Sequence, residues 1–235
     1  MKTIFEPMLR RLYDMLFPRA CAICGQRLAL GEQALCAVCN INLPRTRFIE
    51  DPEDNAMAKT ISSQMAVERA TALYRHLSHS SSGALIYNLK YGGHPEYGDM
   101  MGELMAKEIL PTGFFEGIDL LVPIPLTRDR RRQRGYNQSE FIAEGVSRIT
   151  GTPIGKKIVK RTIFHGSQTD RDARARRENV EGVFRLLKPE AVHGRHVLLI
   201  DDVCTTGATL SSCGMEIKKA GNVRISVLTL GFAGS

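Results

Sequence analysis

The chain of 235 residues is 43% hydrophobic, which allows one large domain, or one domain with a small additional module. Tryptophan is absent and aromatic residues make up 6% of the chain, so composition gives no sign of an aromatic-rich platform for carbohydrate or single strands. The formal charge is +7, and residues 121–178 alone hold 14 Lys and Arg against 6 Asp and Glu. Positive charge gathered in one region favours an anionic partner there, such as phosphate, pyrophosphate or nucleic acid; a solvated basic face is the alternative.

The first 18 residues carry apolar side chains at helical spacing, but Glu6, Arg10, Arg11 and Asp14 interrupt them. A signal peptide needs an unbroken apolar core, so we expect a short amphipathic helix docked on the body, with a membrane-surface role as the alternative. No stretch of the sequence reaches the roughly 18–20 apolar residues that span a bilayer. We therefore expect a cytoplasmic protein with no integral membrane segment.

Four of the six cysteines form two C-x-x-C pairs separated by 11 residues, namely Cys21 with Cys24 and Cys36 with Cys39. This spacing lets four thiolates reach one tetrahedral ion, and it predicts a zinc ribbon. Four protein ligands leave no position for water or substrate, so the zinc is expected to be structural. A disulfide framework fits a reducing compartment less well, and a thioredoxin-like site needs only one pair. Such a ribbon either binds nucleic acid or protein, or serves only as a folding staple.

The rest of the chain alternates strand and helix patterns after a linker-like segment. Strands are expected at 70–75, 120–125, 196–200 and 223–230, and helices at 80–91, 97–110, 137–150 and 208–220. This alternation predicts an α/β fold with a mostly parallel sheet and helices on both faces. The expected domains are an amphipathic helix and zinc ribbon at 1–45, a linker at 46–69 and the α/β domain at 70–235.

An acid pair follows one of the expected strands, where residues 197–210 read VLLIDDVCTTGATL. Asp201 and Asp202 are placed at the carboxyl end of a buried strand, where ligands of parallel sheets bind. A helix starting near Gly207 directs its N–H groups and its dipole at an anion, and neighbouring threonines add hydroxyl donors. Acids that accept from ribose hydroxyls beside a phosphate cradle suit a sugar phosphate, and a divalent cation would relieve the clash of like charges.

These residues carry a resemblance. DDVCTTGAT after VLLI resembles the ribose-phosphate motif of type I phosphoribosyltransferases, which use 5-phosphoribosyl 1-pyrophosphate (PRPP) and magnesium. LVPIPL (121–126), RRRQRGYNQSE (130–140), NLKYGGHPEYGDMM (88–101) and the N-terminal ribbon are similar to ComF-type competence proteins. The mobile Q-T…R-R-x-N-x-x-G-x-F loop of that family is matched by Gln168, Thr169, Arg176, Arg177, Asn179, Gly182 and Phe184.

The resemblance implies a type I phosphoribosyltransferase-like domain that binds PRPP with Mg²⁺. Asp201 and Asp202 would hold ribose and metal, the threonine loop the 5′-phosphate, and the basic segment the pyrophosphate. The implied catalytic residues are Asp201, Asp202, Arg128 and Arg134, and the implied PRPP-binding residues are Asp201, Asp202, Val203, Cys204, Thr205, Thr206, Gly207, Ala208 and Thr209.

The chain has two clusters of arginines, and the first holds more of them than pyrophosphate needs. The first, which we expect as a loop, comprises Arg128, Arg130, Arg131, Arg132 and Arg134, and its surplus either tracks a nucleic-acid backbone or is solvated. The second, at 171–177, is either a loop that closes over the site or a charged helix start. Cys204 is expected as a space-filler, with a lowered thiol pKa near the helix start as the alternative.

Departures from related enzymes restrict the activity. Thr205 stands where purine-salvage enzymes carry a catalytic Asp, and Met1–Lys2 offers no N-terminal cysteine of the glutamine amidotransferase kind. Asp170 and Arg171 replace the Gly-Leu that often follows the Gln-Thr pair.

The resemblance implies a role in DNA uptake or in the use of DNA as a nutrient, and transfer of phosphoribosyl from PRPP with release of pyrophosphate stays open. The alternatives are a non-catalytic PRPP sensor, a single-stranded DNA-binding protein, or an adaptor for other proteins of the uptake machinery.

Overall fold

A computed structural model describes residues 19–77, 80–162 and 183–234. The strands are β1 (Ala70–Arg75), β2 (Leu120–Pro123), β3 (Val159–Arg161), β4 (Phe184–Leu186), β5 (His196–Cys204) and β6 (Arg224–Phe232). The helices are α2 (Ala37–Ile41), α3 (Ala56–Ser62), α4 (Ser81–Tyr91), α5 (Glu96–Ile109), α6 (Arg128–Arg134), α7 (Gln138–Thr150) and α9 (Ala208–Lys218), with 3-10 turns η1 (Phe48–Glu50), η2 (Leu110–Thr112) and η3 (Pro189–Ala191). Each strand and helix predicted between residues 70 and 230 occurs within a few residues of its expected bounds.

The central sheet has four strands in the order β1-β6-β5-β2, and every pair in it is parallel. A parallel sheet must be covered on both faces, and its inner strands are therefore apolar throughout. Every residue of β6 after Arg224 is buried, and β5 is buried along nearly its whole length. The predicted α/β class with a mostly parallel sheet and helices on both faces is confirmed.

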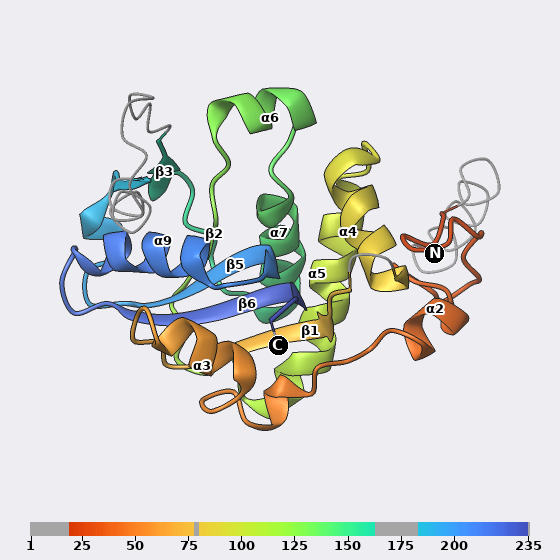
Figure 1. Ribbon diagram of the computed structural model, residues 1–235, viewed down its shortest axis with the longest axis horizontal. Helices are drawn as coiled ribbons and strands as arrows, with labels where there is room; N and C mark the ends of the chain where they lie inside the picture. The colour runs from red at the N-terminus through yellow and green to blue at the C-terminus, as the bar shows by residue number, and fades with distance from the viewer. Residues whose placement is uncertain (1–18, 78–79, 163–182, 235) are drawn as a thin grey trace, which may run out of the picture.

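Alternate residues of β5 point into two separate apolar cores. Leu198 and Ile200 pack in one core with residues of α5 and α7, whereas Val197 and Leu199 pack in the other with residues of α3 and α9. Figure 1 shows α3 and α9 over one face of the sheet and α5 and α7 behind the other. This period of two is the signature of a strand between two layers.

The segment 46–69, expected as a linker, contains η1 and α3. Asn55 caps α3 by accepting from the N–H groups of Met57 and Ala58, and Met57 and Ile61 are fully buried against the sheet. The sequence analysis missed this helix because Pro52 and mixed charges make its short apolar face hard to recognise. The division of the chain into the three expected domains stays a prediction.

The basic segment after β2 is a helix and not the expected loop. Thr127 caps α6 by accepting from the N–H of Arg130, and Gly135 ends it in the left-handed conformation with φ of 83°. These two signals override the repulsion among the arginines. Figure 1 shows α6 standing beyond β2 and α7 at one end of the molecule.

The expected N-terminal amphipathic helix and the expected closing loop at 168–182 lie outside the described residues, although β3 and β4, which pair antiparallel, flank that loop. Within the part of the chain that the structure describes, no helix is long and apolar enough to cross a membrane.

Candidate functional site

The acid pair lies within β5 and not after it, because the strand continues four residues past Ile200. Both carboxylates are buried, and each is held by the first turn of α7. Ser139 donates its hydroxyl to Oδ1 of Asp201 at 2.9 Å, and Gln138 donates its amide to Oδ2 of Asp202 at 2.7 Å. A buried acid needs such partners, so α7 fixes the position of both side chains.

The ionisation of Asp201 is disfavoured in this arrangement. Burial and then the neighbouring carboxylate of Asp202 raise the pKa of Asp201 to about 7, against the donors Asp202 N–H and Ser139 hydroxyl, which lower it. Two buried acids next to each other resist simultaneous ionisation. A cation bound between the two carboxylates would allow both to ionise, as expected of a metal-binding pair.

A chain of polar contacts connects the acid pair to the arginine helix. The ammonium of Lys90, on α4, lies 3.0 Å from Oδ2 of Asp202. The Oε1 of Gln138 accepts from the guanidinium of Arg134, so Gln138 bridges Arg134 and Asp202. The helices α4 and α7 therefore both contact the Asp202 carboxylate of β5, and α6 is connected to it through Gln138.

A cavity of about 390 Å³ opens over these groups. Its size suits a small phosphorylated molecule, since ligand pockets commonly measure about 300–1,000 Å³. Both acids and several cations line it; the lining includes His76, Lys90, Arg130, Arg134, Gln138, Arg161, Asp201, Asp202, Val203, Thr205 and Thr209. Burial, and then the nearby charge of Arg130, lower the pKa of Arg161.

The structure brings only some of the predicted site residues to this cavity. Both acids, Arg134, Val203, Thr205 and Thr209 line it, whereas Arg128, Cys204, Thr206, Gly207 and Ala208 are not among its lining residues. Arg128 begins α6 and is exposed, and Arg130, two residues further along that helix, faces the cavity instead.

The loop after β5 is held by its backbone. Gly207 is the N-cap of α9 with φ of 75°, a conformation in which a side chain is strained. The carbonyl of Thr206 accepts from the amide of Gln64 at 2.6 Å. With the loop in this conformation, Thr205, just before the 11-residue helix α9, and Thr209, in its first turn, line the cavity.

Cys204 is a packed core residue. Its side chain belongs to the apolar core on the α9 face, and burial raises its thiol pKa to about 12. The alternative of a lowered pKa at the helix start is wrong, because removal from water outweighs the donors of the loop.

The four N-terminal cysteines form a cluster in which all four sulfur atoms lie within 4.8 Å of one another. The sulfurs of Cys24 and Cys36 are 3.7 Å apart. Zinc–sulfur bonds of about 2.3 Å at tetrahedral angles place sulfurs at about this separation. The four cysteines therefore can hold one metal ion.

Local structure explains how the thiols converge. Cys21 accepts at its carbonyl from the N–H of Gly25, which turns the first pair with φ of 73°, and Cys36 is the N-cap of α2, which carries Cys39. Glu32 ties the two halves together, because its carboxylate accepts from the N–H groups of Ala29 and Ala37, each at 2.6 Å.

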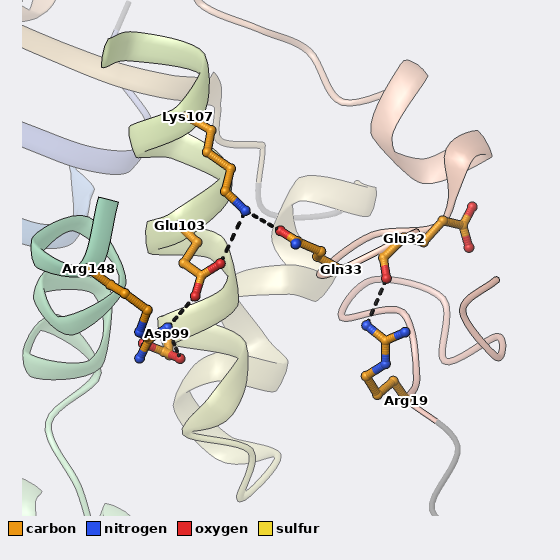
Figure 2. Close-up of polar contacts among 7 residues, drawn as sticks. All are labelled: Arg19, Glu32, Gln33, Asp99, Glu103, Lys107 and Arg148. Atoms are coloured by element: carbon orange, nitrogen blue, oxygen red, sulfur yellow. Dashed lines mark hydrogen bonds and ion pairs between the residues drawn. The ribbon is translucent and has the colours of Figure 1, made fainter. Parts of the chain in front are cut away.

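The cysteine ribbon (residues 19–43) is joined to the α/β body. Ala22 and Cys36 belong to the same apolar core as Leu85 and Leu89 of α4, and Asn88 donates to the carbonyl of Ala22 at 3.0 Å. Figure 2 shows a further polar contact between ribbon and body, in which Lys107 of α5 donates to Gln33 at 2.7 Å.

From Lys107 the same network continues into the body. Lys107 also lies 3.3 Å from Glu103, and Arg148 of α7 pairs with Glu103 and with Asp99 (Figure 2). The ribbon is thereby connected through α5 to the helix that positions both acids.

Sequence reasoning missed the roles of Lys90, Gln138, Ser139, Arg161 and His76. Their segments carried signals, since Lys90 falls in the LKYGG stretch and Gln138 follows the helix cap Asn137. Lys90, Gln138 and Ser139 contact the two acids, and His76 and Arg161 line the same cavity, only because the elements that carry them pack together in the fold.

The fold and this cavity define the class of protein: a parallel α/β protein with an acid pair in a cation-rich pocket, joined to a four-cysteine ribbon. No family model matches the chain. The chain is 28% identical over 224 residues to the DNA utilization protein YhgH of Escherichia coli K12, covering 91% of this chain and 96% of that protein.

Two further relatives match over shorter stretches. They are competence protein F of Haemophilus influenzae, 34% identical over 46% of this chain and 48% of that protein, and competence protein ComFC of Bacillus subtilis, 33% identical over 44% and 41%. These homologues confirm the predicted resemblance to ComF-type competence proteins.

Among solved structures, the glutamine PRPP amidotransferase of B. subtilis is similar with a TM-score of 0.37 and 20% identity, over 57% of this chain and 26% of that chain.

Proposed function

We propose that this protein binds PRPP with Mg²⁺ in the cavity over β5 and acts in the uptake or use of DNA. One observation carries the proposal: two buried carboxylates face a cavity whose other walls hold Lys90, Arg130 and Arg134. PRPP has the matching chemistry, because its ribose diol suits acids and its phosphates suit cations and a helix N-terminus. The names of the curated relatives, DNA utilization and competence proteins, support the biological setting.

Different residues of the cavity would bind different parts of PRPP. Asp201 and Asp202 would accept from the ribose hydroxyls, and Thr205 and Thr209 would donate to the 5′-phosphate at the start of α9. Lys90, Arg130 and Arg134 would face the pyrophosphate. Val203, Thr206, Gly207 and Ala208 would contribute backbone to the same loop, and Arg128 would add charge from the start of α6.

The donor set fits magnesium. Carboxylates are the ligands that Mg²⁺ takes from proteins, and the raised pKa of Asp201 indicates an acid pair that a cation would relieve. Asp201 and Asp202 would hold the ion, which would supply charge neutralisation between ribose and pyrophosphate oxygens.

In the transfer of phosphoribosyl, the main contribution of this chain would be electrostatic stabilisation of the leaving pyrophosphate. As the bond from C1 to pyrophosphate lengthens, negative charge grows on the leaving group, and preformed cations at that position lower the barrier. Gln138 holds Arg134 in place through its hydrogen bond, while its amide holds Asp202. The alternative of a PRPP sensor uses the same contacts without transfer.

Calorimetry with PRPP and MgCl₂ tests the binding. We expect the wild-type protein to bind and the double variant Asp201→Asn/Asp202→Asn to lose binding, whereas Asp54→Asn, which changes an exposed acid that pairs with Lys59, keeps it. Absence of binding by the wild type would contradict both the enzyme and the sensor. Pyrophosphate release with a panel of bases then separates the two.

The second proposal concerns the ribbon: the cysteines hold a structural zinc. Four thiols in tetrahedral reach of one another leave no position for a substrate, and the surrounding ribbon is too small for a core of its own. The location we propose for the whole protein is the reducing cytoplasm, which such thiolates require.

A further inference from the structure

A second cavity, of about 440 Å³, adjoins the first between α4 and α6. It is lined by Lys90, Tyr91, Gly93, Arg130, Gln133 and Arg134. Lys90, Arg130 and Arg134 line both cavities, so these three cations form the wall between them. The acids of β5 line only the first cavity, which leaves the second with cations and an aromatic ring.

Two tyrosines of α4 extend this cavity as an exposed aromatic surface. Tyr87 and Tyr91 are 65% and 67% exposed, and their ring centroids are 5.3 Å apart. The guanidinium of Arg134 lies over the Tyr91 ring, 5.4 Å from its centroid. A single exposed aromatic residue is ordinary on a protein surface, but two adjacent rings beside three cations form a patch of defined chemistry.

We propose that this tyrosine–arginine patch, made of Tyr87, Tyr91, Lys90, Arg130 and Arg134, binds single-stranded nucleic acid. Bases stack on aromatic faces without regard to sequence, and a cationic groove beside the rings follows the backbone phosphates. A duplex does not offer its base faces, and an acidic peptide does not offer planar rings. The low aromatic content of the whole chain gives no sign of this patch. The two rings lie together because both tyrosines are on α4.

Because the three cations line both cavities, single-stranded nucleic acid and PRPP should compete for them. A phosphate in the second cavity and the pyrophosphate in the first would draw on the same Lys90, Arg130 and Arg134. Two anionic groups cannot both be neutralised by one set of cations without repelling each other. The competition rests on the proposed function, whereas binding of the strand does not.

Fluorescence anisotropy with a labelled oligothymidine and the full-length protein tests the patch. We expect Tyr87→Ala/Tyr91→Ala to weaken binding roughly tenfold or more, since stacking accounts for that much per base. Arg130→Ala should also lower the dependence of log affinity on log salt by about 0.7, the value for one phosphate contact on a single strand. The matched controls are Leu110→Ala, another exposed apolar residue, and Arg195→Ala, an exposed arginine that directly precedes β5, at the end of that strand opposite to the acids.

Several results would overturn the proposal. They are an unchanged affinity in the tyrosine variant, equally tight binding of duplex DNA or free thymidine monophosphate, and tyrosine-independent binding of an acidic peptide at the same place. Thermal unfolding of each variant checks that the fold is intact, which is expected because both tyrosines are on the surface.

Addition of PRPP with MgCl₂ to the bound strand tests the shared wall, and we expect release of the strand. If calorimetry detects PRPP binding but the strand stays bound, the sharing of cations is wrong. If calorimetry detects no PRPP binding while the tyrosine variant still loses the strand, the proposed function fails and the patch stands.

Discussion

The ammonium of Lys90 lies 3.0 Å from Oδ2 of Asp202, so an acid that we assign to ribose and metal is neutralised by a lysine of the chain itself. The pair is largely removed from water, with side-chain exposures of 24% and 6%. A buried carboxylate without a counter-charge is costly, and Lys90 therefore keeps the cavity stable while no ligand is present.

Lys90→Met should lower the free energy of unfolding by about 1–3 kcal/mol, because it leaves a buried charge without its ion pair. The control Lys107→Met removes a lysine from an exposed pair and should cost less than about 1 kcal/mol. Urea unfolding measures both. In the background of Asp202→Asn the Lys90 substitution should cost little, and an equal cost in both backgrounds would contradict the pairing.

The stability of the protein without ligand should fall as the pH rises toward 7 on account of Asp201. Its pKa is raised to about 7 in the folded state from a usual value near 4, so the folded state binds more protons over that range. Stability from this group is complete below about pH 4 and is lost as pH passes through 7, at a slope of at most about 1.4 kcal/mol per pH unit.

Urea unfolding of the wild type and Asp201→Asn at several pH values isolates this contribution. The difference between the two proteins should change with pH between about 4 and 7 and stay constant above it. A difference that is flat over the whole range would show that Asp201 titrates normally.

Removal of the metal ion should destabilise the α/β body as well as the ribbon. Because Ala22 and Cys36 share a core with Leu85 and Leu89, loss of the ion disturbs the packing of α4 on the body. We expect one zinc per chain by elemental analysis and a melting temperature lower by several degrees after chelation. Cys24→Ser should reproduce the loss of metal, whereas Cys213→Ala, in the α9 core, should keep one zinc per chain.

Gly145→Ala should destabilise, although alanine favours a helix. A Cβ at Gly145 would lie 2.1 Å from the carbonyl oxygen of Asp99, so α5 and α7 would have to move apart. Overpacking of this kind costs about 1–3 kcal/mol and exceeds the gain in helix propensity. Glu144→Ala, at an exposed position on the same helix, is the control and should change stability by less than about 0.5 kcal/mol. An unchanged melting temperature for Gly145→Ala would contradict the close approach of the two helices.

The sequence by itself determined the four strands of the central sheet, the helices α4, α5, α7 and α9, the cysteine cluster and the two acids, but not α6, β3 or β4. These features depend on local periodicity and on short spacing, which one stretch of residues carries alone. It also indicated ComF-type relatives, which the homologues bear out.

Only the tertiary structure decided which cations face the acids. Arg128 and Arg130 differ by two positions on one helix, and the orientation of α6 alone selects Arg130. Lys90 and Gln138 reach Asp202 from two other helices, and the arginines of α6 lie beside Tyr91 only because α6 packs near α4. The physical reason is that local pattern fixes which face of an element is apolar, whereas the packing of helices on the sheet fixes which polar groups meet.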